Sequence, residues 1–476
     1  MDVKRVILAV MALFVSQFTA AETAMEVSES ERAPQKVSQK GPLNGFHAQS
    51  EQIIKPYVEQ SWFSGNVLLA DKNRHVSVRS YGLSNIENGT PNNRCTRFNI
   101  GSIAKHYTAV LVLQMIEQGK LSFESRLSEF ELNVEQEIAS KVTVENLLKH
   151  QAGFSDIFIP AYMNDPLSFD SLEKKVALLK GQPLLFEPGS DYRYSNYGYI
   201  LLGAILEKVS GKSFATLLDE RIFTPINAEN SSLLREESSP CQSERYVYAL
   251  DKSLEPTQFR EVSGPDGGIE STVDDVYKFL NALFFTDKLL QRDGDAFKRY
   301  FGTGTHHGSY GGGTGVSAAA EVLRDRHVII VVLANSDELV AERISNRLSK
   351  LIREEPVDAF TLPAKHFVYD QYKALGLERF KQEFATIYKA AGYTGFMGRP
   401  LNEAGLYLAK NGAGREALDV ISTLSHFYAK APQAYDSLAY VHYLLGDKNA
   451  AQIAFKQARA LSEGFNSDYH QSNYDI

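Results

Sequence analysis

Cysteine is scarce in this chain, since only Cys95 and Cys241 occur among 476 residues. Two cysteines are too few for a disulfide-built scaffold or a cysteine-rich zinc site, and their pairing stays open at this point. Positive charge is also in deficit: 50 Lys and Arg residues stand against 58 Asp and Glu residues, for a formal net charge of -8. A chain with this balance lacks the positive potential that attracts nucleic acid or anionic lipid. We therefore expect no nucleic-acid partner.

The first apolar run is short. It covers residues 6–18, follows Lys4 and Arg5, and precedes the small residues Thr19, Ala20 and Ala21. This order is typical of a secretory signal peptide, and the run is shorter than the span of about 20 residues that crosses a membrane. We predict a signal peptide over residues 1–21, a secreted and periplasmic bacterial protein, and no membrane span after cleavage. A buried N-terminal helix is the alternative.

The rest of the chain divides into segments that differ in composition and in hydrophobic periodicity. Hydrophobic residues make up 43% of it, enough for large cores, and its length favours two or three domains. Residues 22–44 are polar without aliphatic periodicity, which predicts a disordered linker. Residues 45–355 mix helix and strand signals, among them the continuous run 326–335, whose Val and Ile content predicts a strand covered on both faces. An amphipathic helix is expected directly after it.

Beyond residue 356 strand signals nearly vanish and a period of 34 residues appears. The equivalent pairs are Gly405 and Ala439, Gly412 and Gly446, Ala417 and Ala451, and Ile421 and Phe455. This period, with small residues where paired helices approach closely, resembles tetratricopeptide repeats. We predict an all-helical domain over residues 356–476, completed by helices within 365–395. Two roles for this domain stay open: it is either a docking surface for a protein partner or a stabilising appendage.

Ser102 and Lys105 are the first candidates for chemistry. They form a Ser-x-x-Lys motif at the start of a segment whose apolar residues recur at helical spacing, so the two side chains lie one turn apart on one face. A hydroxyl becomes a good nucleophile when a neighbouring base takes its proton, and a lysine amine held uncharged can do so. A second Ser-x-x-Lys, at Ser171 and Lys174, lies in a charged stretch and predicts only a solvated helix face.

Tyr194 and Asn196 come just before a second apolar helix and after the turn formed by Pro188 and Gly189. A tyrosine on such a loop can relay a proton, and the asparagine amide can hold Lys105 or a substrate carbonyl. A turn of packed tyrosines is the alternative.

The third candidate segment is glycine-rich and runs from His306 to Gly313. Glycines let a backbone approach a ligand, and a strand edge can stabilise a developing negative charge. Adjacent histidines in a strand point to opposite faces, so His306 and His307 do not suit a metal, and we predict no metal site. We expect His106 and His150 to be packing or surface residues.

In this order the motifs resemble those of the serine beta-lactamase and penicillin-binding-protein superfamily, over residues 45–355. Segments 142–154 and 264–283 support the resemblance. It implies an α+β fold, a central antiparallel sheet flanked by helices and joined to the all-helical domain. It also implies that Ser102 attacks an acyl carbonyl while Lys105 and Tyr194 move its proton. Asn196 would hold Lys105 and contact the substrate, and the Ser102 and Ser309 amides would form the oxyanion hole. No cofactor is implied.

The third motif departs from the penicillin-recognising members, which carry Lys-Thr-Gly or Lys-Ser-Gly. Here His306, His307 and Gly308 are similar to the His-x-Gly of relatives that act as esterases or D-amino-acid-specific peptidases, and we expect His306, Gly308 and Ser309 to contact the substrate. A second register, Ser309-Tyr310-Gly311, is also open. Losing the lysine removes a positive charge that would pair with a substrate carboxylate.

We therefore predict an exported serine hydrolase that acts through an acyl-enzyme on an ester or a small peptide, including peptides with D-residues. The alternatives are a true beta-lactamase or D-Ala-D-Ala carboxypeptidase, and a non-catalytic binding protein. The expected partners are a small-molecule or peptide substrate and, through the helical repeats, a protein.

Overall fold

The computed structural model describes residues 44–71, 76–257, 259–467 and 469. The predicted signal peptide lies outside these residues, as does the predicted linker except for residue 44. The chain forms two compact units: residues up to 248 with residues 254–358, and residues 249–253 with residues 359–476. The boundary predicted from the sequence was 355/356, and the grouping of residues 249–253 with the second unit was not predicted. Among the described residues, no helix is both long and apolar enough to cross a membrane.

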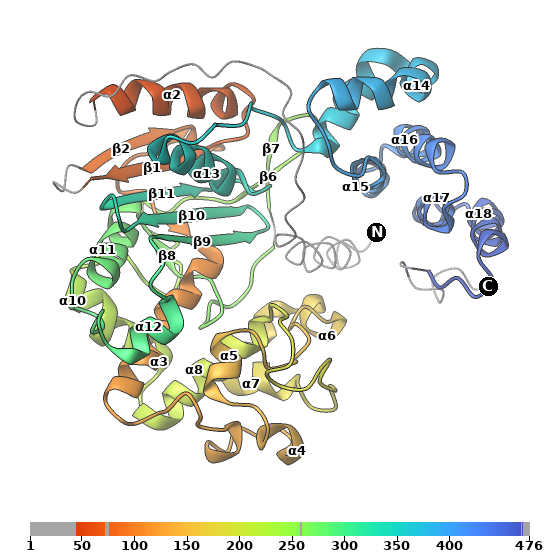
Figure 1. Cartoon of the computed structure of the whole chain (residues 1–476). Helices are drawn as coiled ribbons and strands as arrows, with labels where there is room; N and C mark the ends of the chain where they lie inside the picture. Colours follow the sequence, from red (N-terminus) through yellow and green to blue (C-terminus); the bar gives the residue numbers. More distant parts are fainter. Residues whose placement is uncertain (1–43, 72–75, 258, 468, 470–476) are drawn as a thin grey trace. The chain divides into compact units, whose positions relative to one another are not determined.

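A five-stranded antiparallel sheet, in the order β2-β1-β11-β10-β9, is the centre of the first unit (Figure 1). The predicted buried strand is β11, where Val and Ile residues face helices on both sides. The edge strand β9 is followed by a tight turn into β10. The strands of this sheet are β1 Gly65–Ala70, β2 Val76–Tyr81, β9 His306–Gly313, β10 Val316–Leu323 and β11 Val328–Ala334.

Three short two-stranded sheets complete the strands of the described chain. Among them, β5 pairs with β8 and holds the residues that lead into Ser102. The bounds are β3 Leu83–Asn85, β4 Thr90–Pro91, β5 Phe98–Asn99, β6 Tyr246–Tyr248, β7 Leu254–Pro256 and β8 Glu270–Ser271.

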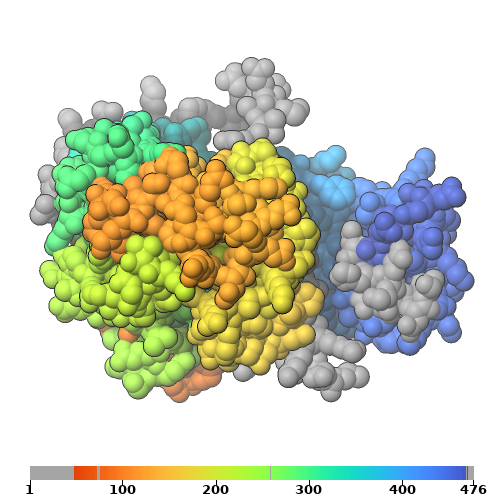
Figure 2. Space-filling model, turned by 90° about the horizontal axis from the view of Figure 1, so that it is seen from below, coloured from red at the N-terminus to blue at the C-terminus, as the bar shows by residue number. Residues whose placement is uncertain are grey.

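Helices cover both faces of the central sheet. α2 and α13 lie together on one face, and α13 is the amphipathic helix predicted after β11. The other face packs on the main core, to which α3, α8 and α11 contribute. Figure 2 shows the segments coloured orange to yellow-green, which include α4 to α8, meeting on one continuous face. The helices are α2 Asn44–Glu59, α3 Ala104–Glu117, α4 Gln136–Ala139, α5 Val144–Leu148, α6 Pro160–Asn164, α7 Leu172–Ala177, α8 Asn196–Ser210, α9 Phe214–Leu218, α10 Thr224–Ile226, α11 Val273–Phe284, α12 Asp295–Phe301 and α13 Val340–Arg353.

The second unit is helical throughout its described elements, and α14 provides the helices predicted within 365–395, with a break in helical geometry at Gly376. The period of 34 residues corresponds to two helix pairs. Gly412 and Gly446, which separate the helices of each pair, both have φ of +82°. The bounds are α14 Ala364–Ala390, α15 Gly398–Lys410, α16 Gly414–Phe427, α17 Pro432–Leu444 and α18 Lys448–Leu461.

Candidate active site

Ser102 lies in a short 3-10 turn, η2 (Gly101–Ile103), that leads directly into α3. Its hydroxyl oxygen is 2.7 Å from the Tyr194 hydroxyl and 3.0 Å from Lys105 Nζ. Lys105 is one turn along, as its spacing predicts, and only 5% of it is exposed. A hydroxyl held between a phenol and an amine can lose its proton to either group.

The Lys105 amine is surrounded by oxygens. Besides Ser102 Oγ, Nζ contacts Asn196 Oδ1 at 2.7 Å and the backbone carbonyl of Asp266. Asn196 is the first residue of α8, and its amide nitrogen donates to both carboxylate oxygens of Asp156, at 3.0 and 3.2 Å. This pair of bonds turns the amide so that Oδ1 faces the lysine. The contacts of Asp156 and Asp266 were not predicted from the sequence.

Tyr194 is fixed by an aromatic neighbour. The His150 ring stacks on the Tyr194 ring with 4.5 Å between centroids, and His150 Nδ1 accepts the Ser195 N–H at 3.3 Å. Burial lowers the pKa of His150 to about 3, so its imidazole is neutral at pH 7. His150 is a packing residue, as expected, but the group against which it packs is the candidate proton relay.

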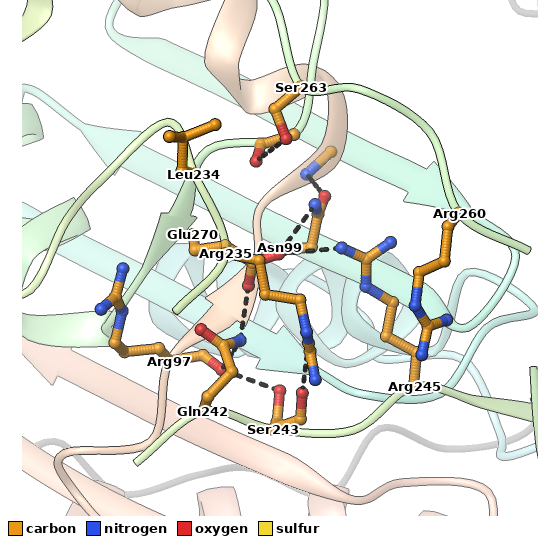
Figure 3. Close-up of polar contacts among 12 residues, drawn as sticks. Arg97, Asn99, Leu234, Arg235, Gln242, Ser243, Arg245, Arg260, Ser263 and Glu270 are labelled. Carbon is orange, nitrogen blue, oxygen red and sulfur yellow. Dashed lines mark hydrogen bonds and ion pairs between the residues drawn. The ribbon is translucent and has the colours of Figure 1, made fainter. Parts of the chain in front are cut away.

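A buried carboxylate supports the turn that carries Ser102. Figure 3 shows Glu270 accepting hydrogen bonds from the side chains of Asn99, Gln242 and Arg245, at 3.2, 2.8 and 2.8 Å. Asn99 Oδ1 in turn accepts the Gly101 N–H at 2.9 Å. The network therefore links the nucleophile turn to strand β8, which carries Glu270.

The glycine-rich segment forms β9, and its register places Gly311 beside Ser102. A Cβ built on Gly311 would lie 2.2 Å from the Ile100 carbonyl oxygen and 2.9 Å from the Ser102 amide nitrogen. Only a glycine fits this approach. Of the two registers considered for the third motif, Ser309-Tyr310-Gly311 is therefore the one at the nucleophile.

The structure does not bring His306 and Gly308, which were predicted to contact the substrate, together with the Ser102 cluster. Side chains alternate along a strand. The His306 ring contacts the carboxylate of Glu321, as does the Tyr310 hydroxyl, at 2.6 Å. Glu321 is also 3.5 Å from a serine of α13, so these side chains lie on the α13 face of the sheet, opposite to α3.

The turn between β9 and β10 decides which β9 amides face outward. Only two residues separate the paired Gly313 and Val316, and a pair that closes such a turn exchanges both backbone hydrogen bonds. Hydrogen-bonded and non-bonded pairs then alternate along the ladder. The Ser309 N–H therefore donates to β10, whereas the Gly312 N–H points outward at the sheet edge. The ladder therefore turns the Ser309 amide, which the sequence analysis assigned to the oxyanion hole, toward β10, and leaves the Gly312 amide facing outward.

The Ser309 side chain instead faces α3. Its hydroxyl is 2.7 Å from Nδ1 of His106, the residue after Lys105. Burial lowers the pKa of His106 to about 4, so the imidazole is neutral at pH 7. The first position of the third motif is thus a hydroxyl paired with an uncharged ring.

Comparison with known proteins identifies the family. A family model described as "Beta-lactamase" matches residues 51–353, well over half of the chain. The chain belongs to the beta-lactamase family. A relative in this family, penicillin-binding protein 4* of Bacillus subtilis, is 26% identical over 255 residues, which cover 50% of this chain and 56% of the relative. The chain thus spans little more than half the length of that protein.

Solved structures agree on the fold. The penicillin-binding protein of Bacillus halodurans has a TM-score of 0.56 and 25% identity, covering 63% of this chain and 98% of its own. A D-stereospecific amidohydrolase from Streptomyces has a TM-score of 0.54 and 20% identity, covering 64% of this chain and 97% of its own. The beta-lactamase fold, an antiparallel sheet flanked by helices, is thereby confirmed, and the helical second unit stands beyond the matched region.

Proposed function

We propose that this protein is a serine hydrolase that forms an acyl-enzyme on Ser102. The observation that carries the proposal is the position of the Ser102 hydroxyl, within hydrogen-bond distance of both Lys105 and Tyr194. Beta-lactamase-family relatives that carry out serine hydrolysis support the reaction class.

The neighbours of Lys105 suit an amine that accepts a proton. An uncharged amine has two N–H groups and one lone pair. Asn196 Oδ1 and the Asp266 carbonyl can only accept hydrogen bonds, and they match the two N–H groups. The Ser102 hydroxyl can donate its hydrogen to the lone pair of the uncharged amine. In the proposed step the Ser102 oxygen bonds to the substrate carbonyl carbon while its proton passes to Lys105, directly or through Tyr194.

Collapse of the tetrahedral intermediate breaks the bond to the leaving alcohol or amine, and Tyr194 returns the proton to that group. The outward amide of Gly312 and the amide of Ser102 stabilise the oxyanion. Water then attacks the ester on Ser102 and gives a proton to the same Lys105 and Tyr194 pair. The bond between the acyl carbon and the Ser102 oxygen breaks, the pair returns the proton to that oxygen, and the acid leaves.

The substrate class follows from the third motif. Penicillin-recognising members have a lysine where this chain has Ser309, and the hydroxyl here is paired with the neutral His106. Without that charge a substrate carboxylate is bound weakly. We therefore propose esters and small amides that lack a free carboxylate, including those of D-amino acids, rather than penicillins.

A substrate panel on the purified protein tests this proposal. We expect turnover of p-nitrophenyl esters or D-amino-acid p-nitroanilides, little turnover of nitrocefin, and loss of all turnover in Ser102→Ala. Rapid nitrocefin hydrolysis would instead identify a true beta-lactamase. Turnover that is unchanged in Ser102→Ala would contradict the proposed nucleophile.

We also propose export of the protein to an oxidising compartment. The disulfide between Cys95 and Cys241 supports this, because such bonds persist in the periplasm and outside the cell. Fractionation of cells that express the full chain, with a test for removal of residues 1–21 by N-terminal sequencing, checks the proposal. A protein found only in the cytoplasm with an intact N-terminus would contradict it.

A further inference from the structure

Beyond the last helix of the second unit, the chain turns back onto α15 and α17. Tyr469 is the key residue of this C-terminal segment, defined as residues 463–467 and 469. Its hydroxyl accepts a hydrogen bond from Asn402 Nδ2 at 2.9 Å and is 3.3 Å from Ser437 Oγ. Its ring stacks on the Tyr440 ring, with 4.4 Å between centroids and 4° between planes.

Ser467 provides the second anchor of the segment. Its hydroxyl donates to Asp436 Oδ1 at 2.7 Å and accepts the Tyr469 N–H at 3.0 Å. Asp436 is fully buried, and a buried carboxylate is stable only when donors reach it. Phe465 adds an apolar contact, packing against the small core between α17 and α18.

The receiving residues come from the repeat itself. Asn402 on α15 and Asp436 on α17 are 34 residues apart, so they occupy equivalent positions in the two copies. The same positions on two successive first helices thus form one surface, which we name the α15–α17 site: Asn402, Asp436, Ser437 and Tyr440.

The α15–α17 site keeps an unused acceptor. Asn402 Oδ1 is buried and, among the described residues, has no hydrogen-bond partner. Buried amide oxygens are normally paired. The C-terminal segment pairs the amide nitrogen of Asn402 and leaves this oxygen without a partner among the described residues. A carboxylate, an amide, a hydroxyl and an aromatic ring on one surface are the groups that recognise a polar peptide with an aromatic anchor.

We propose that the α15–α17 site is a peptide-binding site for a segment with a serine followed two positions later by a tyrosine, and that the chain's own C-terminal segment is its resident ligand. The proposal is independent of the hydrolase reaction. Fewer than ten residues tether the ligand to α18, so its effective concentration is on the order of millimolar. A free peptide of the same sequence must exceed that concentration to displace it.

The test is fluorescence anisotropy with a labelled peptide of sequence EGFNSDY, residues 463–469. We call a variant whose C-terminal segment no longer fills the site the opened variant. Ser472 and Tyr474 repeat the same serine and tyrosine spacing, so both tyrosines are replaced: the opened variant is Tyr469→Ala/Tyr474→Ala in the full-length chain. We expect the opened variant to bind the peptide at least about 10-fold more tightly than the wild type. The single variant Tyr474→Ala is the matched control and should bind like the wild type.

Adding Asn402→Ala or Ser437→Ala to the opened variant should weaken the peptide at least about 5-fold, and the peptide EGFNSDA should not bind. Circular-dichroism melts verify that each variant is folded, and the milder Ser467→Ala gives a second way to open the site. Equal binding by opened and wild-type chains would overturn the proposal, as would no binding by either. Wild-type dimers that disappear in the opened variant would also overturn it, since the ligand would then belong to a second copy.

Discussion

At the scale of single residues, the proposed mechanism assigns the oxyanion hole to one outward-facing amide, that of Gly312, together with the Ser102 amide. The Gly312 N–H is free of the β-ladder, and proline is tolerated on an edge strand where the N–H points outward. We predict that Gly312→Pro lowers kcat about 10²- to 10³-fold, because it removes this donor and puts a ring carbon in its place. Steady-state kinetics on the ester substrate measure the loss.

Gly312→Ala is the control for this prediction. It keeps the N–H, and a Cβ at Gly312 would meet only the Leu339 side chain, at 3.4 Å. An equal loss of kcat in both variants would show that any side chain at this position is harmful and would refute the role of the Gly312 amide.

A second residue-scale prediction concerns pH. Burial holds the pKa of His106 near 4, below its unfolded value of about 6.5. Between these values the unfolded chain binds the proton and the folded chain does not, so stability falls as pH falls through this window. We expect His106→Gln to reduce the slope of unfolding free energy against pH, near pH 5, by about 1.4 kcal/mol per pH unit.

Urea unfolding at pH 4.5 and pH 5.5 measures this slope. Ser309→Ala is the control, because it removes the hydroxyl that contacts His106 but keeps the titrating ring. A slope that is the same in wild type and His106→Gln would contradict the buried, neutral histidine.

Sequence reasoning found Ser102 and the three groups around it, Lys105, Tyr194 and Asn196, because residue type and spacing identify them. The signals are a helical Ser-x-x-Lys and a Tyr-x-Asn before a helix. It missed the groups whose contribution is not encoded by residue type. The Asp266 carbonyl and the Gly312 amide are backbone groups. Which carbonyl of a loop or which amide of a strand faces the site depends on the path of the loop and the register of the strand. Asp156 and His150 act on Asn196 and Tyr194 from a segment distant in sequence.

At the scale of elements, the contact between β9 and the turn η2 holds the site together. We predict that Gly311→Ala destabilises the protein by about 1–3 kcal/mol, since the new Cβ would overlap backbone atoms of the nucleophile turn. A shift of about 1 Å there should also lower kcat about 10²-fold. Thermal melts and kinetics on the same samples measure both effects.

Gly304→Ala is the matched substitution. A Cβ at Gly304 would meet only the His306 carbonyl oxygen, at 3.9 Å, so we expect near wild-type stability and activity. If Gly311→Ala were equally harmless, the close approach of β9 to Ser102 would be disproved.

Helices and strands could be predicted where the pattern of apolar residues is continuous. Features that depend on strand pairing or on contacts between distant residues could not be predicted. The run 326–335 gave β11, and the following amphipathic segment gave α13. The register of the third motif stayed open because His306 and Ser309 each stand two positions before a glycine. Only the pairing of β9 with β10 tells which face of the sheet each side chain takes. The pairing of Cys95 with Cys241 likewise joins positions 146 residues apart that no local pattern connects.

At the scale of the whole molecule, the two units have separate hydrophobic cores. The disulfide lies in the first unit and closes a long loop, for which about 2–5 kcal/mol of stabilisation is expected. We predict two calorimetric transitions, of which Cys95→Ser/Cys241→Ser lowers only one. A single transition that shifts as a whole would show that the units unfold together.

The central claim is that Ser102 is the nucleophile, and intact-mass spectrometry after treatment with a fluorophosphonate tests it most directly. The account predicts one adduct on the wild-type protein, one on Ser171→Ala, which removes the serine of the second Ser-x-x-Lys, and none on Ser102→Ala. An adduct that persists in Ser102→Ala, or that disappears in Ser171→Ala, would contradict it.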